Sequence, residues 1–143
     1  MTSYETIFNC FLRKIHDAEL ARQMEYNPDL VREDLIGYLH SAVAKTGYLE
    51  QTGITFDDDA EMIEEDLSDL EIELYALGVM VEWLTPLVNR RSNIAQMFTG
   101  SESKFYAQAN HLSQIREMLQ DCKIEILKIK REYGYEHNDY LGT

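Results

Sequence analysis

The largest concentration of residues that could do chemistry is an acidic tract in the middle of this 143-residue chain, made of Asp57, Asp58, Asp59, Glu61, Glu64, Glu65 and Asp66. Asp57, Asp59 and Glu61 stand at the first, third and fifth positions of a calcium-binding EF-hand loop. The rest of the motif is missing, because Met62 occupies the place of the turn glycine and Ser68 that of the bidentate glutamate. We therefore predict a solvated or partner-facing acidic loop without a metal ion.

The same tract suggests a magnesium site like that of helical nucleoside triphosphate hydrolases, since Glu61, Glu64 and Glu65 lie close together. Such enzymes hold the metal between carboxylates of facing helices. Glu71 and Glu73 follow too closely in sequence to come from an opposing helix, and no glycine-rich phosphate loop accompanies them. We therefore expect no enzymatic activity and no cofactor.

The histidines and cysteines give no clearer active site. Di-iron bundles need a glutamate three residues before a histidine. The residues three before His16, His40, His111 and His137 are Arg13, Gly37, Gln108 and Gly134. A serine or cysteine nucleophile with a histidine base stays open, but no strand-turn-helix signature supports one. We interpret each histidine as an ordinary partner for a backbone or carboxylate group, and Cys10 and Cys122 as core residues of a protein from a reducing compartment.

One acidic residue interrupts the most apolar part of the chain. Glu82 is the only charged residue between positions 74 and 84, and a buried carboxylate must be paired, hydrogen-bonded or protonated. We predict a buried polar anchor paired with a basic residue of the last helix, or a group that faces solvent at a gap in the packing. Trp83, Phe105 and Tyr106 are predicted core residues, with anchoring of a partner as the alternative for one of them.

The overall charge restricts the partners. Acidic residues outnumber basic ones by 26 to 13, and the net charge of −13 repels phosphate backbones and anionic membranes. The first ten residues lack the basic start and apolar run of a signal peptide, and residues 74–88 are too few for a membrane span. We expect a cytosolic protein that binds neither membranes nor, directly, nucleic acid.

Four helices are expected to position these residues. The first opens with Thr2 as cap and Glu5 returning the bond, and the second starts at Pro28 after the cap Asn27 and stops near Gly47. Residues 48–67 show no lasting periodicity and their like charges repel one another. For them we predict a loop, or a loop that contains a short helix.

The third helix begins with a capping box of Ser68 and Glu71, and residues 74–84 are apolar nearly all round, with Glu82 as their one charged residue. Such a helix must be surrounded by protein, so we place it at the centre, with a kink or an end within a turn of Pro86. Its predicted core residues are Leu70, Leu74, Leu77, Val81, Trp83 and Leu84.

The last helix is predicted to start at Ser101 or Ser103 and to run to Tyr133, before Gly134 terminates it. A seam with the alternating spacing of a coiled coil follows it and consists of Phe105, Leu112, Ile115, Leu119, Cys122, Ile126, Ile129 and Tyr133.

Two groups of residues lie beside this seam. A basic edge is formed by Arg116, Lys123 and Lys130, while Ile124 and Leu127 lie off the seam. We predict that the two apolar residues contact another chain. Residues 135–143 form a tail, either frayed or extended toward a partner. Its candidate partner-binding residues are Tyr135, His137, Tyr140 and Leu141.

Together these patterns predict one all-α domain over residues 1–134, a bundle of four main helices with a long C-terminal helix and an acidic loop.

Two longer segments have a distinctive order and spacing. They are LSDLEIEL at residues 67–74, continuing to VMVEWLTP at 79–86, and KFYAQANHL at 104–112 before a charged helix. With the opening YETIF at residues 4–8, they resemble a family of small virion proteins of tailed phages that infect Gram-positive bacteria. The resemblance implies a neck or head completion protein, like the helical adaptors that form a ring under the portal and connect capsid to tail.

The resemblance also implies the partners: the portal, a neighbouring neck or tail ring, and further copies of this chain. It places the protein in the virion after synthesis in the host cytoplasm, with DNA passing through the channel without specific binding. A soluble acidic regulatory module that binds a basic host protein is the alternative from a different class. An enzyme is the third class, which magnesium-dependent nucleotide turnover would reveal.

Overall fold

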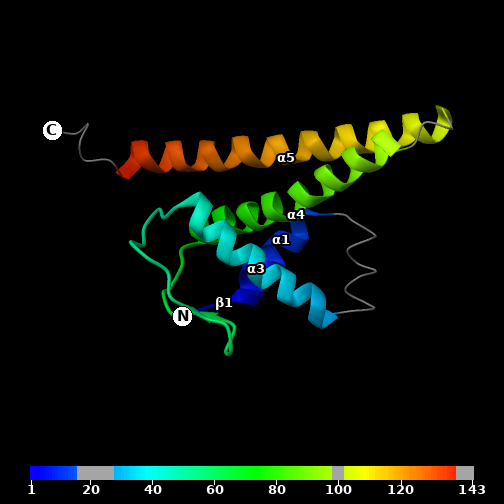
Figure 1. Ribbon diagram of the computed structural model, residues 1–143. Helices are drawn as coiled ribbons and strands as arrows, with labels where there is room; N and C mark the ends of the chain where they lie inside the picture. Colours follow the sequence, from blue (N-terminus) through cyan, green and yellow to red (C-terminus); the bar gives the residue numbers. More distant parts are fainter. Residues whose placement is uncertain (16–27, 98–101, 138–143) are drawn as a thin grey trace.

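The computed structural model describes residues 1–15, 28–97 and 102–137 (Figure 1). Its elements in chain order are β1 (Thr2–Ser3), α1 (Tyr4–Lys14), α3 (Pro28–Thr46), β2 (Phe56–Asp57), β3 (Met62–Ile63), α4 (Asp69–Met97) and α5 (Glu102–His137). The described chain is mostly helical, which agrees with the all-α prediction in its main feature. Three short strands add a small sheet that the sequence analysis did not predict.

α4 is the central helix, with α1 and α3 on one side and α5 along the other (Figure 1). Residues 74–80 of α4 are all buried, as expected for a helix covered by protein on every side. Trp83 is half-buried and meets Phe11 of α1 edge to face, with 5.8 Å between the ring centroids. Within the described ranges, the residues without solvent exposure are Tyr4, Ile7, Phe11, Leu39, Ile63, Glu71, Leu74, Tyr75, Ala76 and Val79.

The predicted core residues of α4 have unequal burial. Leu74, Leu77 and Leu84 are buried, and Val81 is half-buried. The prediction for Leu70 is wrong, because this side chain is 37% exposed. It lies in the first turn of α4, where only one face of the helix is covered. Glu71, on the neighbouring face of the same turn, is the residue that packs inward.

The capping box at the start of α4 is confirmed. The backbone N–H of Glu71 donates to the Ser68 hydroxyl at 3.2 Å, and the N–H of Ser68 donates to Glu71 Oε1 at 3.4 Å. The cap predicted for the first helix is wrong by one residue. Ser3 caps α1 by accepting from the N–H of Glu5, whereas the Thr2 hydroxyl donates to the carbonyl of Glu65 and accepts from the N–H of Leu67.

The predicted start of α3 at Pro28 and its end near Gly47 are confirmed, while the predicted cap Asn27 lies outside the described residues. The helix begins with Pro28 and ends at Thr46, followed by Gly47 with a φ of 80°. The N–H of Gly47 donates to the carbonyl of Val43 at 3.3 Å. A left-handed glycine that returns a bond to the last turn is the usual way to end a helix.

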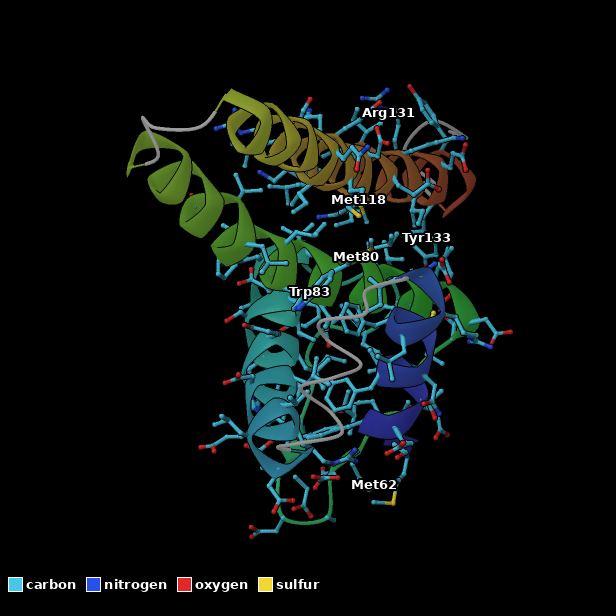
Figure 2. The ribbon with its side chains drawn as sticks, turned by 90° about the vertical axis from the view of Figure 1, so that its right-hand side faces the viewer. Met62, Met80, Trp83, Met118, Arg131 and Tyr133 are labelled. Atoms are coloured by element: carbon cyan, nitrogen blue, oxygen red, sulfur yellow. The ribbon has the colours of Figure 1, made fainter. Side chains whose placement is uncertain are left out.

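Of the two alternatives predicted for α4 near Pro86, a kink or an end, the structure has the kink. The helix continues to Met97 and changes direction near Trp83, within a turn of Pro86 (Figure 2). α5, in contrast, is longer than predicted. Gly134 does not end α5, which continues to His137. Gly134 has no left-handed φ, and a side chain added there would meet no atom within 4 Å. The glycine therefore has no capping role, and the prediction that it terminates the helix is wrong.

Residues 48–67 contain a β-hairpin instead of the predicted loop or short helix. β2 and β3 pair antiparallel, β1 pairs with the other edge of β3, and Ile63 faces both Thr2 and Phe56. The N–H of Tyr4 also donates to the carbonyl of Glu61 at 3.0 Å. The prediction failed because it counted repulsion within the tract and omitted the donors that α1 and α3 supply.

Candidate protein-binding surface

α5 contacts the rest of the protein through one narrow stripe. Leu112, Ile115, Cys122 and Ile129 are buried, and Leu119, Ile126 and Tyr133 are half-buried, which is the spacing of the predicted seam. Figure 2 shows Tyr133 pointing from α5 toward the body and Arg131 pointing away from it. The side chain of Phe105 lies outside the described part of α5. The remaining faces of this long helix are therefore exposed along its described length.

Three large apolar side chains on α5 point away from the stripe. Ile124 is 53% exposed, Leu127 is 62% exposed and Tyr135 is 70% exposed. At about 100° per residue, Ile124 and Tyr135 fall on one face and Leu127 beside it. We call these three residues the outer face of α5. The other tail candidates are not placed, because Tyr140 and Leu141 lie outside the described residues, as does the side chain of His137.

A groove of about 330 Å³ lies between α3, α4 and α5, next to the outer face. Its apolar lining consists of Ala42, Gly78, Val81 and Ile126, with the exposed Leu127 at the rim. Gly78 brings α3 and α4 close together, since an added Cβ would lie 2.8 Å from Ala42 Cβ. Three lysines, Lys45, Lys123 and Lys130, and one acidic residue, Glu82, also line this cavity. We call it the basic groove.

The groove has a net charge of +2, from three lysines and one glutamate. Lys45 Nζ lies 2.9 Å from a carboxylate oxygen of Glu82, which is mostly buried. Lys130 donates to the carbonyl of Thr46 at the end of α3, where cations are favoured. The predicted anchoring of Glu82 is therefore found, but its partner comes from α3 and not from the last helix.

On the opposite side of α4, the acidic tract is bonded to the body. Two nitrogens of Arg32 donate to the carboxylate of Glu61, and its terminal nitrogen also donates to Glu5 at 2.8 Å. The Arg32 guanidinium lies over the Phe8 ring, 5.8 Å from its centroid. The hydrogen bond from Arg32 lowers the pKa of Glu61, and in return raises the pKa of Arg32.

Asp58 forms a second link between the tract and the body. Its Oδ1 accepts from the Tyr4 hydroxyl at 2.6 Å and lies 2.8 Å from His40 Nε2. These two hydrogen bonds lower the pKa of Asp58. The His40 ring also lies against Phe56 of β2, with centroids 4.0 Å apart. The interpretation of His40 as a partner for a carboxylate group is confirmed.

A second recess, of about 370 Å³, lies at the N-terminal half of α3. Asp29, Glu33, Asp58 and Glu61 line it together with Arg32 and Ile36, which gives a net charge of −3. Asp34 and Leu30 lie nearby on the same helix and are exposed. We call the exposed set Asp29, Leu30, Glu33 and Asp34 the acidic face of α3.

The cysteines are buried, as expected for core residues. Cys10 Sγ donates to Glu73 at 3.3 Å, and Lys14 forms an ion pair with the same carboxylate. Burial raises the pKa of both thiols. Burial also opposes ionisation of Glu73, yet its bonds from Lys14 and Cys10 lower its pKa overall. A thiol with a raised pKa is a poor nucleophile at neutral pH.

Sequence reasoning identified the apolar outer face and the basic edge of α5 but missed Lys45 and Arg32. Both belong to α3, and the patterns used for that helix described only its apolar side and its ends. A lysine or arginine on the polar side of a helix gives no local signal of its partner. The isolated Arg32 between acidic neighbours was the available hint that a nearby carboxylate needed a cation.

Comparisons with protein-family models, with curated proteins and with solved structures each found no match for this chain. Among the described residues, no helix combines the length and apolarity that crossing a membrane requires.

Proposed function

We propose that this chain is a non-enzymatic structural component of a phage virion, part of the neck that joins the capsid portal to the tail. The observation that carries the proposal is the outer face of α5, where Ile124, Leu127 and Tyr135 are each more than half exposed. Large apolar side chains that a helix exposes on the side away from its own core are available for contact with another protein. We propose that the portal or a neighbouring ring covers this surface.

The neck role itself comes from the resemblance of residues 67–86 and 104–112 to the virion family. Two further features are compatible with that role. The net charge of −13 would keep an acidic ring from adhering to DNA that passes through its channel. The body does not need α5's outer face for its own core, because the buried residues of α5 are those of the seam.

Binding to the portal protein of the same phage tests the proposal. The full chain is co-expressed with the portal, and the amount that sediments with portal rings is measured. We expect Ile124→Asp and Tyr135→Asp to reduce co-sedimentation roughly tenfold each, since a buried apolar anchor contributes more than 1 kcal/mol. Gln114→Asp, an exposed residue elsewhere on α5, is the matched control and should bind like the wild type.

The tail is tested in the same assay. Removing residues 138–143 leaves α5 complete to His137, so the fold should be unchanged. We expect this truncation to abolish attachment to the portal. Wild-type chain that does not sediment with portal rings would overturn the neck role. Stoichiometric capture of a basic host protein in its place would favour the acidic regulatory module.

A further inference from the structure

The two ends of α3 hold surfaces of opposite charge. The basic groove includes Lys45 near the C-terminal end of the helix, and the acidic face begins with Asp29 near its N-terminal end. Nineteen residues separate the two ends by roughly 28 Å at the usual helical rise. Figure 1 shows the C-terminal end of α3 close to α5 and the N-terminal end far from it. One copy therefore cannot bring its own two surfaces together.

A basic groove is unusual on this chain. With a net charge of −13, most of the surface repels an acidic partner, whereas the groove carries +2. Lys123 forms no hydrogen bond or ion pair with another described residue, and neither do Asp29, Glu33 and Asp34. These charges are exposed, so their pairing with another chain costs less desolvation than pairing of buried charges. The groove can thus accept an acidic surface.

Each surface also exposes one leucine. Leu127 is 62% exposed at the rim of the groove, and Leu30 is 58% exposed on the acidic face. On α3, Leu30 lies one turn before Glu33 and Asp34, so the three side chains share a face. An occupant of the groove needs an apolar group for the apolar lining and carboxylates for the lysines. The acidic face of α3 carries both in one turn and a half of helix.

We propose that a second copy of this chain docks its acidic face into the basic groove. Leu30 of the second copy lies on the apolar lining against Leu127, and its carboxylates face Lys123 and Lys45. The contact is heterologous, because it joins two different surfaces of identical chains, and its repetition closes a ring when the rotation allows. Groove-to-groove pairing is disfavoured, since it would place lysines against lysines. This inference rests on the proposed role as a ring component and names the contact between neighbouring copies.

Two charge-reversal variants of the full chain test the contact. The acidic-face variant is Glu33→Lys with Asp34→Lys, and the groove variant is Lys123→Glu with Leu127→Glu. All four side chains are exposed, so both variants should fold, which circular dichroism and thermal melting check. Lys128→Glu and Glu132→Lys, exposed on α5 and outside the groove, are the matched controls.

Sedimentation at increasing protein concentration is the measurement. We expect the wild type and both controls to form species larger than a dimer, more weakly at high salt. Each variant alone should associate at least roughly tenfold more weakly. An equal mixture should form a one-to-one dimer and nothing larger, because only one intact groove and one intact acidic face then meet. This last result distinguishes a heterologous contact from a symmetric dimer.

Three results would overturn the contact: a wild type that stays monomeric up to its solubility limit, variants that associate like the wild type, or a mixture that remains monomeric. None of them depends on the portal assay, where Ile124 and Tyr135 are changed. If the wild type does not bind the portal but the two mixed variants still form the dimer, the neck role is rejected and the contact between copies is kept. Portal binding without self-association would reject the contact and keep the neck role.

Discussion

The two sides of α4 are stabilised differently. On the side of α1 and α3, buried aromatic and aliphatic residues are combined with polar links between distant parts of the chain, such as Arg32 with Glu61 and Tyr4 with Asp58. On the other side, α5 is held mainly by an apolar stripe, with Lys130 donating to the end of α3. The core cluster of the body extends to α5 only through Ile115, Cys122, Ile129 and the half-buried residues beside them, and most of the described surface of α5 is exposed.

The largest expected loss of stability comes from a cavity created in the core of the body. Leu74 has no solvent exposure, so Leu74→Ala should lower the free energy of unfolding by about 2–5 kcal/mol. Leu119 on α5 is half-buried, and Leu119→Ala should cost about 1 kcal/mol. Denaturant unfolding monitored by circular dichroism measures both. Equal losses would mean that α5 is as much a part of the core as α1 and α3.

A smaller effect is expected where α3 crosses α4. Gly78→Ala places a Cβ at 2.8 Å from Ala42 Cβ and 3.0 Å from Thr46 Cγ2, and the resulting overpacking should cost about 1–3 kcal/mol. Gly37→Ala is the matched control, because its Cβ would meet nothing within 4 Å. That change in a helix interior should increase the free energy of unfolding by roughly 0.4–1 kcal/mol, and with it the melting temperature. A stable Gly78→Ala protein would show that the helices can move apart freely.

A further, smaller change in stability is expected at the turn of the hairpin. Glu61 has a φ of 54°, a left-handed conformation that costs less for glycine than for other residues. Its carboxylate accepts from Arg32. Both Glu61→Ala and Glu61→Gly lose that pair, but only the glycine relaxes the backbone. We expect Glu61→Gly to be more stable than Glu61→Ala by about 1 kcal/mol in thermal unfolding. The reverse order would show that the left-handed backbone at Glu61 does not destabilise the protein.

The smallest effect is a pH dependence. The pKa values of Asp58 and Glu61 are lowered in the folded protein, from ordinary values of 3.8 and 4.5. Carboxyl groups of this kind contribute stability above their unfolded pKa and lose it as the pH falls through the folded one. The free energy of unfolding should therefore decrease from about pH 4.5 downward. Denaturation across that range measures it, and Asp58→Asn should flatten the slope. Both groups are partly exposed, so solvent screening keeps the change modest.

Local features of the fold were predictable from the sequence. The capping box of Ser68 and Glu71, the start of α3 at Pro28 and its end before Gly47 each depend on residues within one turn. The spacing of the α5 seam is local as well, because a helix repeats its faces regularly. For the candidate surface, the same periodicity identified Ile124 and Leu127 as residues that lie off the seam.

Features that depend on distant partners were not predictable in this way. The hairpin forms because Asp58 meets Tyr4, 54 residues away, and Glu61 meets Arg32, 29 residues away. Pairwise repulsion within the tract was visible in the sequence, while these donors were not. Lys45 was missed as the partner of Glu82 for the same reason, since the crossing of α3 and α4 decides which lysine reaches that carboxylate.

The sequence by itself determined a mostly helical chain, an apolar central helix and an outward pair of apolar residues on α5, because periodicity and caps act over a few residues. Only the tertiary structure decided that the acidic tract folds into a hairpin and that α5 continues past Gly134. It also decided between the kink and the end predicted at Pro86, and it gave α3 a basic groove at one end and an acidic face at the other. Those outcomes depend on which helices pack together. Charges far apart in the sequence gain or lose their partners only when that packing is set.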